Sequence, residues 1–413
     1  LTLGCTGVKR TTGQHPGGLV VIPQDKDVTD FCPVQHPADD PNSDIITTHF
    51  EYHCMEDNLL KLDMLGHDDP TMVRMMQDLT GVDPHEIPLD DPDTMSIFVS
   101  SKVLGFENDE LLGPTGAVAI PEFNTRFTRG MLMDTLPKDF NTLVRLSGFS
   151  HGTDVWLGNA RELIVSGTAS VLETVGCRDD IMLYLISMGL DPKMSFKIME
   201  AVRKGKVKKG GFQEGWVEAM QEHNVPQWYI DSLAKIGYLF PKAHAVAYVM
   251  MAFRIAWFKV HRPLAFYATF FTVRAKAFDA EYCCAGIDAV KQKIREIENN
   301  KDATAVEKNL MVTLEVCYEF YLRGFHFDTI SIYDSDATAF KITENGLLPP
   351  FISVRGLGES AALDTVEKRK GKRFISVEEF STCCNKLSKT HIEQLKALGS
   401  FAGMADTSQI TLF

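Results

Sequence analysis

The sequence predicts an α+β protein that is mostly α-helical and divided into several domains. Its 413 residues exceed what one hydrophobic core usually organises, so about two or three domains are expected. Apolar residues recur with helical spacing from about residue 70 to 276, whereas strand-like alternation is confined to residues 1–65 and 325–342. The hydrophobic content of 45% and charged content of 23% are ordinary for globular proteins, which excludes a disordered, collagen-like or coiled-coil chain.

Charge and cysteine content narrow the class of protein further. The formal net charge is −13, and the 9 cysteines form neither a Cys-x-x-Cys motif nor a cluster with zinc spacing, so reduced thiols and no zinc site are expected. The most apolar stretch, residues 243–257, carries His244 and Arg254 and is shorter than the about 18 residues that span a membrane. The first residues show neither a signal peptide nor an initiator methionine. We expect a cytoplasmic protein with no membrane partner, and a chain that is a fragment of a longer one.

The apolar pattern and the turn residues place the elements along the chain. Strands are expected at residues 19–22 and within 58–65, followed by helices at 71–79, 140–146, 160–164, 177–188, 192–203, 213–223, 226–236 and 243–259. Two more helices, separated by the polar residues 299–302, are expected in 280–323. Short strands are expected in 325–342, and a compact helical unit with two glycine turns in 351–403.

The strand within residues 58–65 carries a charged pair. Leu60 and Leu62 alternate with Lys61 and Asp63, which predicts that the leucines share a buried face and that the charged side chains share the other. A carboxylate is a hard oxygen ligand for Mg²⁺, and an ammonium neutralises phosphate. The pattern therefore suits a metal-assisted phosphate site at Asp63, and the alternative is an ordinary ion pair on an exposed strand face.

A run of small residues follows the helix predicted at 140–146. Ser147, Ser150 and His151 lie in a stretch that we expect to be a loop between helices, able to hold a ligand by hydroxyls and backbone. Residues 148–152 also spell Gly-x-Ser-x-Gly, the serine-hydrolase elbow, but that elbow needs a preceding strand and a helical pattern precedes it here. A ligand-binding loop and a plain connecting loop both remain open.

The longest predicted helix opens with Phe-Pro-Lys-Ala-His. Lys242 and His244 lie near its N-terminus, where free N–H groups attract phosphate, and Tyr248 lies one turn beyond His244 on the same face. Phosphate contacts and a stacking ring on one helix face would suit a nucleotide. The alternative is a surface lysine and a core tyrosine.

Basic residues gather in two runs, residues 203–209 and 368–373. Either run could bind phosphate or form a solvated face. The second run ends a helix that begins after Arg355-Gly356-Leu357-Gly358, and residues 387–401 resemble a degenerate second copy of this unit. Two helix–hairpin–helix units would bind the phosphate backbone of a DNA duplex without contacting its bases. The expected DNA-binding residues are Arg355, Gly356, Gly358, Lys368, Lys370 and Lys389.

The C-terminal tail combines a glutamine with spaced apolar residues. Gln409, Ile410, Leu412 and Phe413 suit a peptide that docks into a groove on a partner protein. The alternative is a frayed terminus, in which Leu412 and Phe413 would be exposed apolar residues.

Several of these stretches, in this order, resemble the C-terminal portion of the bacterial replicative DNA polymerase III alpha subunit of the PolC type. The resemblance runs along essentially the whole chain, and its stretches are GVKRTTGQHPGGLVVIP, THFEYHCMEDNLLKLDMLGHDDPTM, IPEFNTRF, LSGFSHGTDVWLGNARELI, CRDDIMLYLISMGL, HNVPQWYIDSLAKIGYLFPKAHAVAYVMMAFRIAWFKVHRP, PPFISVRGLG and QITLF. The related DnaE-type subunit carries further domains after its hairpins, whereas this chain stops at the tail, which favours the PolC type.

The resemblance implies a domain order. Residues 1–70 would be the C-terminal part of the palm, 71–276 the fingers, and 277–347 the connecting part of the duplex-binding region. Residues 348–403 would be the tandem helix–hairpin–helix unit, and 404–413 the tail that binds the β sliding clamp.

The resemblance also implies roles for single residues. Asp63 would be the third catalytic carboxylate and a Mg²⁺ ligand, and Lys61, Lys242 and His244 would contact the triphosphate of the incoming dNTP. Ser147, Ser150 and His151 would lie near the nascent base pair, and the partners would be primer-template DNA, the clamp and other replisome subunits, with the protein associated with the nucleoid. In that family the other two carboxylates lie in an upstream Asp-x-Asp motif, and no such motif lies on a strand ahead of Gly13, so we expect this chain alone not to polymerise. The alternative is a non-catalytic module that binds DNA and tethers the clamp.

Overall fold

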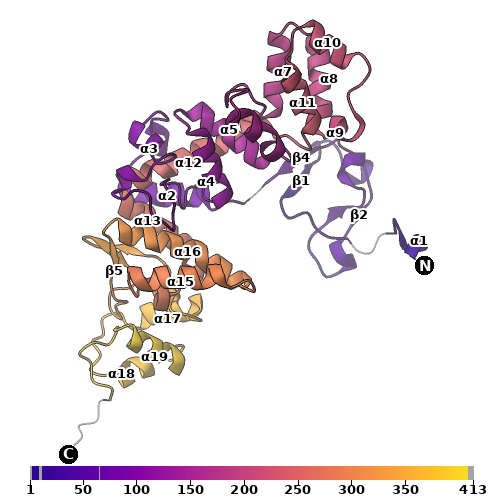
Figure 1. Cartoon of the computed structure of the whole chain (residues 1–413). Helices are drawn as coiled ribbons and strands as arrows, with labels where there is room; N and C mark the ends of the chain where they lie inside the picture. The colour runs from indigo at the N-terminus through magenta and orange to yellow at the C-terminus, as the bar shows by residue number, and fades with distance from the viewer. Residues whose placement is uncertain (1, 9–11, 65, 408–413) are drawn as a thin grey trace, which may run out of the picture. The chain divides into compact units, whose positions relative to one another are not determined.

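The computed structural model describes residues 2–8, 12–64 and 66–407, which form two compact units, residues 1–68 and 69–413. Helices dominate the described residues and the sheets are small, which confirms the predicted fold class (Figure 1).

The first unit is built from two short antiparallel ribbons. Strand β1 (Gly18–Val21) pairs with β4 (Leu60–Asp63), and β2 (Val34–Gln35) pairs with β3 (Thr47–Thr48). Helix α1 (Thr2–Cys5) and the 3₁₀ turns η1 (Val28–Asp30), η2 (Pro37–Asp39) and η3 (Tyr52–Cys54) complete the unit. Its described core is a small cluster of Cys32, Met55 and Leu59.

The prediction that the Leu60 and Leu62 face is buried is wrong. Leu60 is 62% exposed and Leu62 is 46% exposed. Their partners across the ribbon, Val21 and Leu19, are exposed as well, so the apolar side chains form one uncovered face. Val20, on the opposite face, packs against the Cys32 cluster. Alternation shows which side chains share a face, but the rest of the fold decides which face is covered.

The second unit is a helical assembly with one small sheet. Its first helices are α2 (Asp69–Thr80), α3 (Pro92–Ser96), α4 (Arg126–Thr135), α5 (Phe140–His151), α6 (Arg161–Val165), α7 (Arg178–Ser187), α8 (Pro192–Arg203), α9 (Lys206–Gly210), α10 (Trp216–Glu222) and α11 (Gln227–Lys235). The later helices are α12 (Lys242–His261), α13 (Pro263–Val273), α14 (Ala280–Cys283), α15 (Ile287–Asn299), α16 (Ala305–Leu322), α17 (Glu359–Lys368), α18 (Val377–Cys383) and α19 (Lys389–Ala397). The sheet has the order β5-β7-β6, formed by His326–Phe327, Gly346–Leu348 and Lys341–Ile342.

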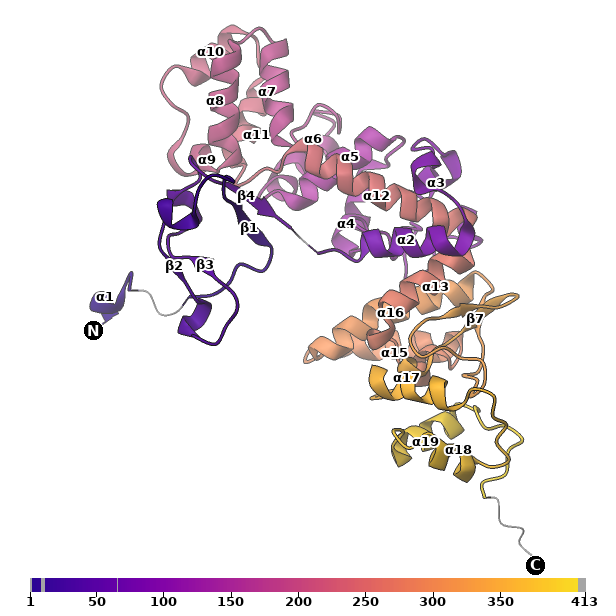
Figure 2. The ribbon, with the colours of Figure 1, turned by 180° about the vertical axis from the view of Figure 1, so that it is seen from behind.

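Helix α12 is the central helix of this unit. It contacts α2, α3, α5, α7 and α13, and Figure 2 shows α2, α3 and α5 along its length from behind. With 20 residues, it is long and apolar enough to cross a membrane, and it is longer than the apolar run that the sequence indicated. Its buried face, which includes Phe253 and Phe258, instead packs in the hydrophobic core, as expected for a core helix.

A buried ion pair joins α12 to α16. Lys259 and Glu319 are both 0% exposed, and the Lys259 Nζ lies 2.7 Å from a Glu319 carboxylate oxygen. The same ammonium donates hydrogen bonds to the carbonyls of Gly116 and Val118, and the Tyr267 hydroxyl donates to Glu319 at 2.6 Å. Burial lowers the pKa of Lys259 to about 8, against the opposing influence of Glu319. Four segments of the chain therefore meet at one pair of charges.

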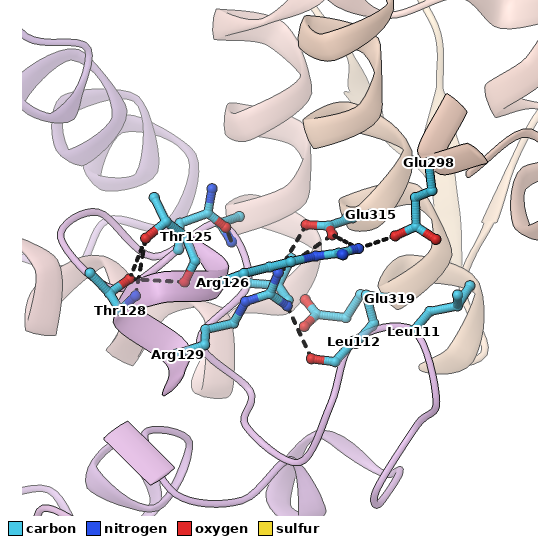
Figure 3. Close-up of polar contacts among 12 residues, drawn as sticks. Leu111, Leu112, Thr125, Arg126, Thr128, Arg129, Glu298, Glu315 and Glu319 are labelled. Atoms are coloured by element: carbon cyan, nitrogen blue, oxygen red, sulfur yellow. Dashed lines mark hydrogen bonds and ion pairs between the residues drawn. The ribbon is translucent and has the colours of Figure 1, made fainter. Parts of the chain in front are cut away.

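A second polar network joins α4 to α15 and α16 (Figure 3). The Arg129 guanidinium donates to the Leu112 carbonyl at 3.0 Å and lies 3.3 Å from the Glu315 carboxylate. Arg126 pairs with Glu298 and lies 3.8 Å from Glu315. Burial raises the pKa of Glu315, and the two arginines oppose that shift. The network fixes the start of α4 against the later helices.

We predict that Lys259→Met destabilises the protein by about 3–5 kcal/mol, because Glu319 then remains buried without its cation. The double variant Lys259→Met/Glu319→Gln should recover part of that loss, since no uncompensated charge is left. Urea unfolding of the two variants and the wild type measures both effects. A single-variant loss below about 1 kcal/mol would show that the pair does not hold the helices together.

Candidate functional site

The end of α5 and the start of α12 lie together, although about ninety residues separate them. The imidazole rings of His151 and His244 have centroids 5.8 Å apart, and the Phe240 ring lies 5.5 Å from His151 and 5.1 Å from His244. Tyr248 lies one turn further along α12, with its ring 4.5 Å from His244. Two motifs that the sequence presents separately thus form one cluster.

The stretch that the sequence predicted as a loop is helical. Ser147, Ser150 and His151 all belong to α5, which ends at His151. The Ser150 hydroxyl donates to the Ser147 carbonyl at 3.0 Å within the helix, so Ser150 does not sit on the strand–turn–helix elbow of a serine hydrolase. The prediction of a loop failed because close packing of the helix outweighs the low helix propensity of glycine and serine.

Glu122 connects the polar side chains at the end of α5. The Ser147 hydroxyl donates to the Glu122 carboxylate at 3.0 Å, and the His151 Nε2 lies 3.3 Å from the same oxygen. The His151 Nδ1 lies 2.8 Å from the Ser147 carbonyl oxygen, so the ring is held between that carbonyl and the Glu122 carboxylate. Glu122 is not among the site residues predicted from the sequence, although it lies in the stretch IPEFNTRF that carries the family resemblance.

Lys242 occupies the first position of α12, but acidic residues share its surroundings. Its backbone N–H donates to the Asp179 carboxylate at 2.7 Å, and its Nζ lies 3.9 Å from Asp180. Asp180 in turn pairs with Arg145 at 2.6 Å. Burial raises the pKa of the nearby Cys177 thiol to about 12. The Lys242 ammonium is partly exposed, and its ion pair with Asp180 is long, so it can approach an anion beside His244.

Two glycines permit this arrangement. A Cβ on Gly148 would lie 2.5 Å from the Gly176 carbonyl oxygen and 2.8 Å from the Cys177 sulfur. A Cβ on Gly176 would lie 2.5 Å from the Arg145 side chain. Residues 176–177 therefore pack directly on α5 at Arg145 and Gly148, on either side of Ser147.

Asp63 and Lys61 lie in the first unit, on the same face of β4 as predicted. The Lys61 Nζ is 3.3 Å from the Asp63 carboxylate and 5.0 Å from the centre of the Tyr52 ring. The Asp63 side chain is 52% exposed. In the described residues, no group of three or more His, Cys, Asp or Glu side chains could hold a metal ion. Among the described residues, Asp63 is therefore an exposed carboxylate outside any metal-binding cluster.

The C-terminal hairpins lie close to each other. Gly356 has a left-handed φ of 78°, and a Cβ there would lie 3.9 Å from the Nε2 of His391, in α19 of the second hairpin. Gly358 precedes the first residue of α17. Lys368 pairs with Asp364 at 2.9 Å and Lys370 pairs with Glu367, so both cations are partly neutralised.

Two further predicted residues of this region, Arg355 and Lys389, are exposed, as is Lys370. The tail residues Gln409, Ile410, Leu412 and Phe413 lie outside the described residues.

Comparisons with known proteins match three stretches of the chain to family models and the whole chain to several relatives. Family models match residues 1–66 (bacterial DNA polymerase III alpha NTPase domain), 69–224 (bacterial DNA polymerase III alpha subunit finger domain) and 324–409 (helix-hairpin-helix motif). The chain is 54% identical to the PolC-type DNA polymerase III of Caldanaerobacter subterraneus subsp. tengcongensis, and 52% identical to those of Halalkalibacterium halodurans and Bacillus subtilis. Each match covers 100% of this chain but only 28–29% of the relative, so the chain spans under a third of their length.

We predict that Gly148→Ala lowers stability by about 1–3 kcal/mol, because the new methyl group collides with the Gly176 backbone. Gly130→Ala is the matched control: Gly130 lies within α4, and a Cβ there has nothing within 4 Å. That change should be neutral or stabilising by up to about 1 kcal/mol. Thermal unfolding of both variants measures the difference, and equal melting temperatures would contradict the packing argument.

Proposed function

Since the chain matches a C-terminal portion of the PolC-type DNA polymerase III family along its whole length, we propose that it contributes nucleotide-binding and DNA-binding surfaces to a replicative DNA polymerase. The observation that carries this proposal is the convergence of His151, His244 and Tyr248 at the junction of α5 and α12. The reaction would be template-directed nucleotidyl transfer, in which the primer 3′-hydroxyl attacks the α-phosphate of a dNTP and pyrophosphate leaves.

The cluster offers the groups that an incoming dNTP requires. Lys242 and His244, at the N-terminal end of α12, would neutralise phosphate oxygens, since helix N-termini and cations both favour anions. Tyr248 and His151 would provide ring faces, and the hydroxyls of Ser147 and Ser150 would lie near the base. Glu122 would act as a positioning residue, because it holds the Ser147 hydroxyl and His151 in place.

The palm strand would contribute one carboxylate. Asp63 would supply an oxygen ligand to Mg²⁺, and Lys61 on the same strand face would neutralise phosphate. When bound, such metal ions stabilise the attacking and leaving oxygens of phosphoryl transfer. The other carboxylates would have to come from residues beyond those described, so the isolated chain should lack polymerase activity.

The remaining surfaces would hold macromolecular partners. The paired hairpins, with Arg355, Gly356 and Gly358 in the first and Lys389 in the second, would grip the backbone of primer-template DNA, supported by Lys368 and Lys370. The tail from Gln409 to Phe413 would bind the β sliding clamp, and other replisome subunits would join the assembly. The protein would act in the cytoplasm, at the nucleoid.

A second function is a non-catalytic module that binds DNA and tethers the clamp. The Asp63 carboxylate is exposed and belongs to no metal-binding cluster among the described residues, which favours this alternative for the chain on its own. The two functions differ in whether a dNTP binds at the α5–α12 junction.

We predict that Asp63→Ala abolishes DNA synthesis by a PolC-length polymerase that contains this chain, while leaving its affinity for primer-template DNA unchanged. The loss is expected because the metal ions lose a charged ligand that no neighbour replaces. Asp25→Ala, at an exposed acidic residue of the same unit, is the control and should retain full activity. Primer extension and DNA binding are measured in parallel, and retained synthesis by Asp63→Ala would remove Asp63 from the catalytic centre.

We predict that His244→Ala and Lys242→Ala each weaken dNTP binding, and raise the apparent KM for dNTP in the longer polymerase, by roughly tenfold. Each change removes a charge-assisted contact to phosphate, which is worth about 1.5–3 kcal/mol. Binding of a fluorescent dNTP to the 413-residue chain measures the first effect directly. Lys276→Ala, an exposed lysine elsewhere in the unit, should bind as the wild type does. Wild-type binding by both site variants would exclude these residues from the site.

A further inference from the structure

The helical group α7–α11 carries a concentration of positive charge that the proposed nucleotide and duplex sites do not use. Between Lys193 and Lys209 there are seven basic residues and one acidic residue, Glu200, in a chain whose net charge is −13. These residues form α8, the turn at 204–205 and most of α9. Figures 1 and 2 show α7, α8, α10 and α11 gathered into one group, and contacts join α8 and α11 to α9.

Part of this charge is neutralised, and part is not. Glu200 pairs with Arg203 and Lys204, and Asp154 pairs with Lys208. The other four cations have no ion-pair partner within the described ranges of the chain: Lys193, Lys197, Lys206 and Lys209. Exposed lysines without partners attract anions over distances of about 10 Å at moderate salt.

An exposed aromatic ring lies among these lysines. Phe196 is 50% exposed, and it lies in α8 three residues after Lys193 and one before Lys197. Residues three and four apart share a helix face, so Lys193, Phe196 and Lys197 are presented on the same side of α8. A ring between cations is a platform on which an unstacked base can rest while its phosphates are neutralised.

The α9 lysines are held by a fixed backbone. Val207, between them, is 3% exposed and anchors α9 in the core. Gly205 has a left-handed φ of 66°, and a Cβ there would lie 2.4 Å from the Gly237 carbonyl oxygen, so this turn is packed against the residues after α11. The lysines of α9 are thus displayed from a rigid turn, which reduces the entropy lost when they bind.

We propose that α8 and α9 form a binding surface for single-stranded DNA, with Lys193, Lys197, Lys206 and Lys209 on the phosphates and Phe196 against a base. The partner class rests on the proposed polymerase function, in which an unpaired template strand must lie near the enzyme. A single strand is favoured over a duplex because only unstacked bases can reach an aromatic ring. This surface is separate in the sequence from the C-terminal hairpins, which would hold the duplex.

The test measures the affinity of the 413-residue chain for a fluorescent oligothymidylate of about 20 nucleotides, at several salt concentrations. Lys206→Ala/Lys209→Ala should weaken binding roughly fivefold or more and reduce the magnitude of the salt slope by about 1.4, since each lysine neutralises one phosphate. The matched control is Lys301→Ala/Lys308→Ala, which removes two exposed lysines. Lys301 lies between α15 and α16, and Lys308 lies in the first turn of α16. An unchanged salt slope in the α9 variant, or an equal change in the control, would overturn the proposal.

A second arm tests the role of the ring. The wild type should bind oligothymidylate more tightly than an abasic strand of equal length. Phe196→Ala should lower the ratio of these two affinities at least about fivefold. Two results would refute single-strand recognition, because each would show that the surface recognises charge alone. The first is equal binding of the two strands by the wild type. The second is complete displacement of bound oligothymidylate by poly-glutamate added at the same concentration of negative charge.

The same assay separates this proposal from the polymerase function. Arg355→Ala/Lys389→Ala should weaken duplex binding and leave oligothymidylate binding intact. If the hairpin variant loses duplex affinity but the α9 variant keeps single-strand affinity, the α8–α9 proposal alone fails. If the wild type binds neither DNA, both proposals fail together.

Discussion

The buried contact between Lys259 and Glu319 is the interaction on which the second unit depends. Two opposite charges that are fully buried destabilise a fold unless every polar group around them is paired. Here the Lys259 ammonium donates hydrogen bonds to two backbone carbonyls, and the Glu319 carboxylate accepts one from the Tyr267 hydroxyl. The Arg323 guanidinium also donates to the Lys259 carbonyl at 2.9 Å. The position of α12 is thereby fixed relative to α13, α16 and the loop at residues 116–118.

This fixed helix also carries the candidate site. The C-terminal half of α12 holds Lys259, and its first turns hold Lys242, His244 and Tyr248. Residues 116–118, which accept hydrogen bonds from Lys259, precede Glu122, which holds the Ser147 hydroxyl and His151. The same elements therefore form both the core and the site, which is the rigid support that precise positioning of a nucleotide requires.

The sequence predicted the helical character, most helix positions and the hairpin turn at Gly356, because periodicity and glycine placement are local signals. It misassigned residues 147–151, where contact with Gly176 holds α5 in a helix, and the burial of Leu60 and Leu62, because only the assembled fold decides which ribbon face is covered. The residue types at the end of α5 and at the start of α12 each predicted a ligand-binding segment. Their proximity and the part played by Glu122 depend on tertiary packing, which no local pattern records.

The most direct test of the central claim is photoaffinity labelling of the 413-residue chain with an azido-dATP, followed by mapping of the modified peptides. A nucleotide held at the junction of α5 and α12 predicts label in peptides that contain residues 140–151 or 242–248, and its displacement by unlabelled dNTP. Label confined to other peptides, or label that dNTP does not displace, would contradict the assignment of this junction as the nucleotide site.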